Sequence, residues 1–540
     1  MEITDTRKRS IHSIAGDYFS YLGRHLPQQC ASDEFYFFPR SETAKSYLNL
    51  LDDLDPDRIQ NHVQTVKTLL CELRTGEMEG LDEEIDSQLL RQSMQSFIRE
   101  WEDTKVWQKD PTLYVKIPLF AVARVLMEKD RTPVQLKEDL LALFAQIPSF
   151  LGLAVKNLDS PPEISLEVAL NMTRDATHFH EQDIRAFIGE TLEGDEELTA
   201  KNKEVSGAWE EYGKALTTLS PSPRFAVGQD LLEEILSVSL GYDRSPSEIL
   251  KTALAAHEET KEKLRALGKK IDSQGRTPTP AETISDLTSP GGVVQLYREQ
   301  VEDLRRFFFN QDCLPLPAEE KVTILQTPVY LQSLRATASY SAPLTGDPGG
   351  SGIFYITPGI SDPEMIIGHC PYLSAHETYP GHHLLDYLRI HHPNPVRRQI
   401  ESPLFYEGWA CYGEQLLDKL GYVQDPRRQI IGLERQLWRD LRAQLDIKLQ
   451  TGQIGFDRAV EEIESLGYSR QRAQRQVRRF CLTPGYQLCY FVGMYEIMKL
   501  RKQLESRTGT KVFHESLLGG GEIPFDLAEK NIEEKLHEKS

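Results

Sequence analysis

Apolar residues recur at spacings of three and four over most of this chain, which is the pattern of amphipathic α-helices. The segments RIQNHVQTVKTLLCELRTG and PVQLKEDLLALFAQIPSFLGLAVKNL both show it. A third segment, SPSEILKTALAAHEETKEKLRALGKK, begins with Ser245 and Glu248 as a capping box and Pro246 at the first helical position. After residue 365 the same periodicity holds nearly to the C-terminus. The sequence therefore predicts a mainly α-helical, multi-helical fold.

Two short segments depart from the helical pattern. KVTILQTP and SGIFYITP are rich in β-branched and aromatic residues, which is typical of strands. With 540 residues the chain is also too long for one ordinary hydrophobic core. The change in character predicts a helical N-terminal region over 1–315 and a second region over 316–540 with a small β element. A polar, proline-rich stretch over 272–292 is expected to be an exposed loop.

The chain has 82 acidic and 62 basic residues, and its formal net charge is −20. This charge argues against nucleic acid or an anionic membrane as the main partner. Seven cysteines are scattered without a C-x-x-C pair, and their odd number favours a reducing compartment. The N-terminal segment has no apolar core typical of a secretory signal, and no run of about 18 apolar residues is visible. We therefore expect a cytoplasmic protein with no membrane partner, and the sequence leaves the oligomeric state open.

The segment SAHETYPGHHLL holds a His-Glu pair and two further histidines within seven positions. The other four His-Glu pairs of the chain have no second histidine in the seven positions that follow, and we interpret them as surface pairs. On an unbroken helix, His382 would lie about 240° round from His376, on the wrong face for one ion. Pro380 and Gly381 allow the helix to break, and the break can return His382 to the place of a second zinc ligand. We therefore predict His376 and His382 as ligands of one zinc ion.

A zinc site of this type needs a third protein ligand, usually a carboxylate. The segment FYEGWACYGEQLL supplies Glu407 and Glu414, which are seven residues apart and share one face of a helix. One can bind the ion while the other holds a ligand in place by a hydrogen bond. Glu377, beside His376, is placed to act as the general base that takes a proton from water. His383 would lie about 10.5 Å from His376 along a regular helix, and it competes for the second histidine place.

Several of these segments resemble known zinc peptidases. EGWACYGE is similar to the EGFAxYxE segment of the M1-type aminopeptidases, in which the first glutamate is a zinc ligand. HETYPGHH followed by EGWA resembles the bacterial family known as DUF885, which is placed with the gluzincin metallopeptidases. The stretches 482–501 and 513–529 are also similar to segments of that family, so clear motifs cover roughly 330–530. Tyr486 departs from the family pattern, which usually has glutamine at that position.

The resemblance implies a gluzincin-like, mainly α fold with one Zn²⁺ ion as cofactor. It also implies a metallopeptidase that hydrolyses short peptides with water activated by the metal. The positions that match the family's functional residues are the metal ligands His376, His382 and Glu407, the catalytic residues Glu377 and Tyr490, the supporting residues Glu414 and His383, and Arg501 for substrate binding.

Other functions stay open at this point. The same zinc chemistry would serve a hydrolase of a non-peptide amide or ester. The histidines could instead pin a helix bend in a non-catalytic helical scaffold. Amino-, carboxy- and endopeptidase activity are not separated by the sequence. For Tyr490, packing inside an apolar helix is an equal interpretation, and His514 is a weaker candidate for the same role.

Two further segments have both an ordinary and a functional interpretation. SRQRAQRQVRRF (469–480) could bind a substrate carboxylate through its arginines, but a solvated helix face that pairs with surface acids is favoured. SGIFYITPG could be an exposed strand that pairs with an extended peptide, or it could be an ordinary buried strand.

Overall fold

The computed structural model confirms a mainly α-helical fold. It describes residues 9–74, 78, 80–127, 131–274, 287, 289–328, 338–345, 351–357 and 363–538. The loop predicted over 272–292 therefore lies largely outside the described residues. The chain forms two compact units, of which the first extends to Phe225 and the second comprises almost all of the chain from Ala226 onward.

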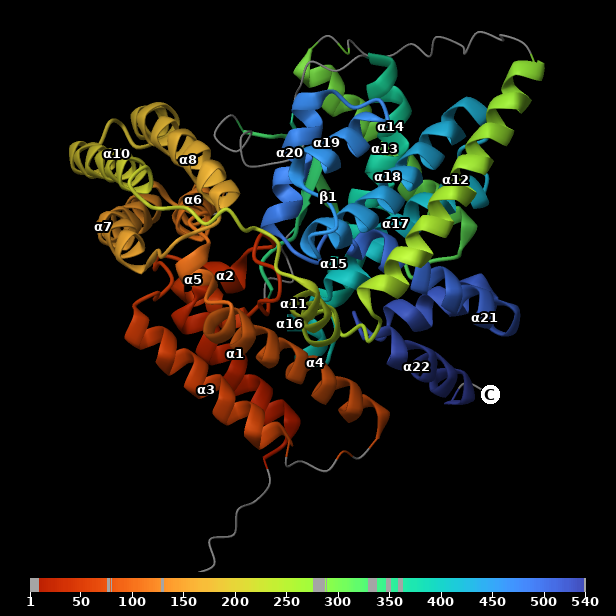
Figure 1. Cartoon of the computed structure of the whole chain (residues 1–540), viewed down its shortest axis with the longest axis horizontal. Coiled ribbons are helices and arrows are strands. Elements are labelled where there is room, and N and C mark those ends of the chain that lie inside the picture. Colours follow the sequence, from red (N-terminus) through yellow and green to blue (C-terminus); the bar gives the residue numbers. More distant parts are fainter. Residues whose placement is uncertain are drawn as a thin grey trace, which may run out of the picture. The chain divides into compact units, whose positions relative to one another are not determined.

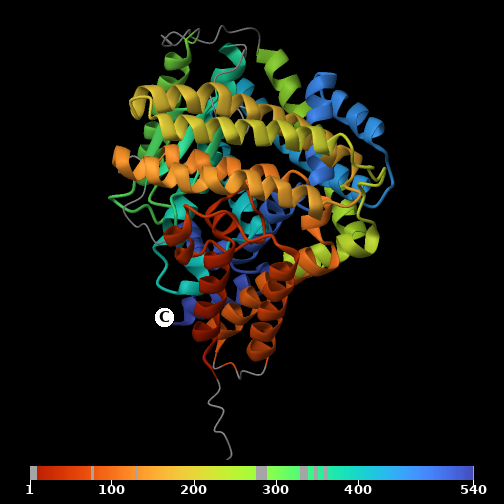
Figure 2. The same ribbon diagram turned by 90° about the vertical axis from the view of Figure 1, so that its left-hand side faces the viewer.

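The first unit is a set of packed helices. Within it α10 packs along both α7 and α8, and α6 packs along α7. These helices can be followed in Figure 2, from orange to yellow. Their bounds are α1 (Ile11–His25), α2 (Pro27–Ala31), α3 (Pro56–Arg74), α4 (Leu81–Ile98), α5 (Val106–Lys109), α6 (Leu113–Met127), α7 (Pro133–Asn157), α8 (Glu163–His178), α9 (Arg185–Thr191) and α10 (Glu196–Leu216).

Helix α7 is the one described helix that is long and apolar enough to cross a membrane by length and composition alone. The core helix of a soluble protein passes the same test. In this structure Leu140, Phe144 and Ile147 of α7 are buried, and the helix packs against α6 and α10. The helix therefore serves as a core element of the first unit.

The second unit is also mostly helical. Helix α12 packs along α18, as Figure 1 shows, while α13 packs on α14 and α17 packs along α21. The bounds are α11 (Gln229–Glu234), α12 (Pro246–Gln274), α13 (Pro290–Gln311), α14 (Pro363–Glu377), α15 (His382–Ile390), α16 (Pro395–Gln399), α17 (Pro403–Lys419), α18 (Pro426–Gln450), α19 (Phe456–Glu464), α20 (Arg470–Leu482), α21 (Cys489–Leu518) and α22 (Phe525–Glu538). Because α12 and α13 pack on these helices, the compact units divide well before the change in sequence character near residue 315.

A three-stranded sheet lies in the second unit. Its strands β1 (Val322–Gln326), β2 (Ala338–Ser341) and β3 (Gly352–Ile356) have the order β1-β3-β2. Strand β3 pairs in parallel with β1 and antiparallel with β2, so it is the central strand. The hypothesis that SGIFYITPG is an exposed strand for peptide pairing is therefore wrong, because both edges of β3 are already paired. The sequence predicts β1 and β3 correctly but misses β2, whose alanine and serines are weak β-formers.

The helix that carries the His-Glu pair is broken where the sequence predicts. Helix α14 ends at Glu377 and α15 begins at His382, and the Tyr379–Pro380 peptide bond between them is cis. The backbone N–H of Gly381 donates to the carbonyl of Ala375 at 2.9 Å. A Cβ atom at Gly381 would lie 1.8 Å from the His376 carbonyl oxygen. The chain can therefore fold back on the end of α14 only because this residue has no side chain.

Replacing Gly381 with alanine is expected to lower the free energy of unfolding by about 3 kcal/mol, because the added methyl group meets a backbone carbonyl that cannot move aside. Thermal unfolding measures this loss. Gly268→Ala in α12 is the control, because a Cβ there has nothing within 4 Å, and it should be neutral or slightly stabilising. Equal unfolding temperatures for the two variants would contradict the close approach at Gly381.

A second close approach joins α17 to α21. A Cβ atom at Gly493 would lie 1.8 Å from the Leu404 carbonyl oxygen, and one at Gly408 would lie 2.4 Å from the Gly493 carbonyl carbon. The two helices therefore pack backbone against backbone. This contact brings the residues at the beginning of α21 beside Glu407 of α17.

Candidate metal centre

Three side chains from three helices converge in the second unit. His376 at the end of α14, His382 at the start of α15 and Glu407 in α17 are all buried. The Glu407 Oε2 atom lies 3.5 Å from His376 Nε2 and 3.6 Å from His382 Nε2. The two imidazole rings are almost perpendicular, at 86°, with their centres 4.7 Å apart. The structure thus brings together the three residues that the sequence predicts as ligands.

The spacing of these donor atoms fits a zinc ion. Donors about 2.1 Å from a tetrahedral zinc lie about 3.4 Å from one another, which matches the two distances measured to Glu407 Oε2. That oxygen is buried and has no hydrogen-bond partner among the described residues. A buried carboxylate oxygen without a partner is costly, and a bound cation would satisfy it. Two histidines and one glutamate are also the donor set of many catalytic zinc sites.

Glu414 holds the imidazole ring of His376 in place through its Nδ1 atom. This Nδ1 atom lies 2.9 Å from Glu414 Oε1, which leaves Nε2 free to face the centre of the cluster. Glu414 in turn accepts hydrogen bonds from Arg435 at 2.5 and 2.7 Å and pairs with Arg439. Although burial opposes ionisation, these two guanidinium groups hold the pKa of Glu414 well below its usual value. Glu414 thus acts as the supporting carboxylate of the predicted pair.

Glu407 is oriented by its other oxygen. The hydroxyl of Tyr486 donates to Glu407 Oε1 at 2.6 Å, so that Oε2 faces the histidines. Burial opposes ionisation of Glu407, but the nearby His376, the charge of His382 and the Tyr486 hydroxyl lower its pKa to about 2. Tyr486, the departure from the family pattern, therefore has a structural role as the donor that orients Glu407.

Burial and the nearby carboxylates together determine the protonation of the two histidines. Burial lowers the pKa of His382 to about 4, so its imidazole is neutral, which is the form that binds metals. Burial also lowers the pKa of His376, but Cys411, Glu407 and Glu414 raise it well above its usual value. The negative charge that attracts a proton to His376 would equally attract a metal cation.

Glu377 lies beside this cluster and is also buried. The backbone N–H of Tyr340 in β2 donates to Glu377 Oε2 at 2.9 Å. Burial raises the pKa of Glu377 to about 7, and the charge of Glu407 adds to this effect. Strand β2, which the sequence does not predict, thus holds the predicted general base. A carboxyl group with this pKa can accept and return a proton near neutral pH.

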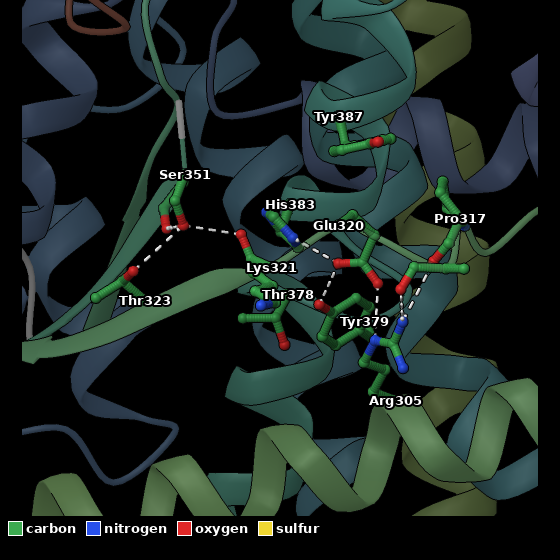
Figure 3. A network of polar contacts seen from close by, with 12 residues as sticks. Arg305, Pro317, Glu320, Lys321, Thr323, Ser351, Thr378, Tyr379, His383 and Tyr387 are labelled. Carbon is green, nitrogen blue, oxygen red and sulfur yellow. Dashed lines mark hydrogen bonds and ion pairs between the residues drawn. The ribbon is translucent and has the colours of Figure 1, made fainter. Parts of the chain in front are cut away.

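His383 does not compete with His382, because its ring faces a different carboxylate. Figure 3 shows Glu320 between His383, Tyr379 and Arg305. The Glu320 Oε2 atom lies 3.0 Å from His383 Nε2 and also accepts from the Tyr379 hydroxyl, while Oε1 accepts from Arg305 Nε at 2.8 Å. The other ring nitrogen of His383 lies 3.3 Å from the Tyr340 hydroxyl. This network ties β2 to α15 and so supports Glu377 through Tyr340. No signal in the sequence indicates Glu320.

Replacing Glu320 with alanine is expected to lower the free energy of unfolding by about 3 kcal/mol, because it leaves His383 and Arg305 without their buried carboxylate. Chemical denaturation measures this loss. Glu319→Ala removes the same charge from an exposed neighbouring residue and should change stability by less than about 0.5 kcal/mol. If both variants unfold alike, Glu320 does not stabilise the second unit.

The sequence profile of a family described as "Bacterial protein of unknown function (DUF885)" matches residues 40–532. The chain belongs to the DUF885 family. The match extends over the N-terminal half, where the motifs of the sequence are weak. Among curated proteins, none matches the chain.

Two solved structures share the fold of this DUF885 chain. One is a "putative lipoprotein of unknown function" from Shewanella oneidensis, with a TM-score of 0.76 and 19% identity, covering 97% of this chain and 99% of that one. The other is a "putative lipoprotein" from Colwellia psychrerythraea, with a TM-score of 0.81 and 17% identity, covering 98% and 99%. At these identities the likeness shows the fold alone.

The same two structures correct the expected location. Lipoproteins are anchored to membranes, and both neighbours carry that description, so they contradict the expectation of a cytoplasmic protein. The expectation relied on the absence of an apolar N-terminal segment and on the scattered cysteines, which are indirect signs of compartment.

The remaining predicted residues of this DUF885 chain divide into two groups. The ring of Tyr490 lies parallel to that of His376, with an angle of 9° and 6.3 Å between centres, so Tyr490 lies beside a predicted ligand while its catalytic role stays a prediction. Arg501 donates to the Tyr412 hydroxyl at 2.8 Å and to Glu505, and these contacts give it a structural role. Its role in substrate binding stays a prediction.

His514 and Arg470, at the start of the arginine-rich segment, have ordinary roles. The ring of His514 lies 2.7 Å from both the Cys313 carbonyl oxygen and the Tyr412 hydroxyl, which ties three segments together. The arginine-rich segment forms α20, where Arg470 is exposed and pairs with Glu464. This supports the favoured interpretation of a solvated face for that residue.

Proposed function

We propose that this DUF885 chain is a zinc-dependent hydrolase of peptide bonds in short peptides. The observation that carries the proposal is the convergence of His376, His382 and Glu407 at the spacing of a tetrahedral site. A buried carboxyl group with a raised pKa, that of Glu377, lies beside them. This combination is what hydrolysis by activated water requires.

Each residue of the site has a distinct role in the proposed reaction. When bound by His376, His382 and Glu407, a zinc ion would polarise the scissile carbonyl group and lower the pKa of water. Glu377 takes the proton from the attacking water and returns it to the leaving amine. The Tyr340 N–H keeps one carboxylate oxygen of Glu377 fixed, so the other is available for the proton. Tyr490 is the candidate donor for the negative oxygen that develops on the substrate.

Metal content and hydrolysis test the proposal together. The purified full-length chain is expected to hold about one zinc ion, because the two candidate donor groups among the described residues share His376. It should cleave a pool of peptides of two to six residues. Removal of zinc with 1,10-phenanthroline should abolish cleavage, and added zinc should restore it. Elemental analysis and mass spectrometry of the pool are the measurements.

Three results would contradict it, each in a different way. Cleavage that persists without metal would remove zinc from the reaction. Zinc-dependent cleavage of acyl-amide or ester pools, with peptides left intact, would favour the non-peptide hydrolase. A chain that neither contains zinc nor takes it up on titration would favour a helical scaffold.

A further inference from the structure

Guanidinium groups and aromatic rings form a row of contacts that begins with exposed Arg472 on α20. Exposed Arg472 lies over the ring of Tyr468, 4.6 Å from its centre. The Tyr468 ring lies 5.0 Å from that of Trp438, and Arg442 lies 6.0 Å from the Trp438 ring on its inner side. We call these four residues, together with Tyr490, the arginine-aromatic row.

The inner end of the arginine-aromatic row reaches the metal centre. The guanidinium carbon of Arg442 lies only 3.7 Å from the centre of the Tyr490 ring. Tyr490 is stacked on His376, 6.3 Å away. Arg442 is therefore within about 10 Å of the His376 ring, a distance that about three extended residues span.

Arg442 forms no salt bridge with a carboxylate in the described part of the chain. Its contacts there are the Gln487 amide oxygen and the two rings, and its buried Nε has no acceptor. Asp446 lies one turn further along α18 and interacts with the charge of Arg442, but its oxygens accept backbone N–H groups from 485, 487 and 488. A partly buried guanidinium group without an acid is costly unless an anion joins it.

The neighbouring arginines of α18 show the contrast. Arg435 and Arg439 both pair with Glu414, as a buried guanidinium group normally does. Arg472 resembles Arg442 instead, since its contact in the described part is an aromatic ring. In a chain with a formal net charge of −20, Arg442 near the metal centre and Arg472 at the surface are two arginines outside any salt bridge in the described part of the chain, and they form a path that attracts an anion.

We propose that Arg442 binds a carboxylate of the substrate beside the metal centre, and that Arg472 attracts the same group further out. This inference rests on the proposed function and names its substrate class, which is short peptides with a carboxylate close to the scissile bond. The planar guanidinium group can hold a carboxylate through two parallel hydrogen bonds. Its stacking on Tyr490 keeps that plane fixed. The carboxylate is either the C-terminus or an acidic side chain.

Equilibrium binding tests the site without turnover. The probes are N-acetyl-leucine and N-acetyl-leucinamide, which differ in having a carboxylate or a neutral amide at the C-terminus, titrated by calorimetry into the zinc-loaded and the metal-free full-length chain. The acid is expected to bind about tenfold or more tightly than the amide in both forms, because a hydrogen bond to a charged group is the larger contribution. Arg442→Gln should abolish this preference, and Arg442→Lys should restore part of it.

One further variant is a control for the binding experiment, and another is a second test of the proposal. Arg475→Gln removes an exposed arginine from the same helix as Arg472 and should leave the preference unchanged. Arg472→Gln lies at the surface, away from the packed interior, and should reduce the preference severalfold even if the Arg442 variants fold poorly. Equal binding of acid and amide, or a full preference in Arg442→Gln, would overturn the proposal. A preference that depends only on zinc would also overturn it, because the metal would then bind the carboxylate.

Cleavage of matched peptides separates this proposal from the function on which it rests. One pair differs in a free or amidated C-terminus, and a second pair differs in glutamate or glutamine next to the scissile bond. A preference for the free acid in the first pair, lost in Arg442→Gln, identifies the C-terminus as the carboxylate that Arg442 binds. A preference confined to the second pair identifies an acidic side chain as that carboxylate. Equal kcat/KM within both pairs overturns the carboxylate site and leaves the peptidase intact. Tighter binding of the acid than of the amide, with no peptide cleaved, supports the carboxylate site and contradicts the peptidase function.

Discussion

Glu377→Gln is expected to keep zinc bound while peptide turnover falls by about a thousandfold, which is the usual contribution of a general base. Glutamine has the same shape, and its carbonyl oxygen can still accept the N–H of Tyr340. It cannot accept a proton from water, so only the proton transfer is lost. The measurements are kcat on a cleaved peptide and the zinc content of the same preparation.

The matched control for this variant is Glu364→Gln, an exposed glutamate at the start of the same helix, which should keep full turnover. A Glu377→Gln protein that retains both zinc and turnover would remove Glu377 from the mechanism. A protein that loses zinc as well would show that Glu377 helps to hold the ion.

Glu407→Ala is expected to weaken zinc binding by more than about a hundredfold and to abolish turnover with it. The reason is that a direct ligand contributes more than a residue that only orients one, for which the usual cost is about 10- to 100-fold. Glu414→Gln provides that comparison, because Glu414 contacts His376 and not the centre of the cluster. Competition with a chromogenic chelator measures the affinity of each variant for zinc.

The reverse order of effects would reassign the site. His376, Cys411 and Glu414 form a second buried group whose donor atoms lie within 4.8 Å of one another. If Glu414→Gln lost zinc and Glu407→Ala kept it, that group would be the metal centre. Circular dichroism of both variants checks that the helices remain folded, since Glu414→Gln also leaves Arg435 and Arg439 without their full partner.

Local chemistry in the sequence predicts much of this site. The spacing of His376 and His382 is incompatible with a regular helix, and Pro380 with Gly381 supplies the break that the structure contains. Glu407 could be predicted because a third ligand was required, and because its segment resembles a known one. These features depend on residues close together in the chain or on strict requirements of a metal.

Features that depend on distant packing could not be predicted in the same way. Strand β2 is short and weak in β-forming residues, and only its pairing with β3 makes it a strand. Glu320 has no motif, and its role appears only when His383 and Arg305 are packed around it. The division after Phe225 likewise follows from α12 packing on α18, which periodicity does not reveal.

The pair of arginines behind Glu414 has a consequence for the choice of ion. Because Arg435 and Arg439 fix the carboxylate that fixes His376, the rotation of this imidazole is set before any ion arrives. Two imidazoles and a carboxylate are also donors that several divalent transition metals share. Cobalt, nickel and copper should therefore also bind in the test tube, in the order of their general affinity for nitrogen and oxygen donors. In the cell, the availability of each metal ion, rather than the geometry of the site, would then decide which ion the protein binds.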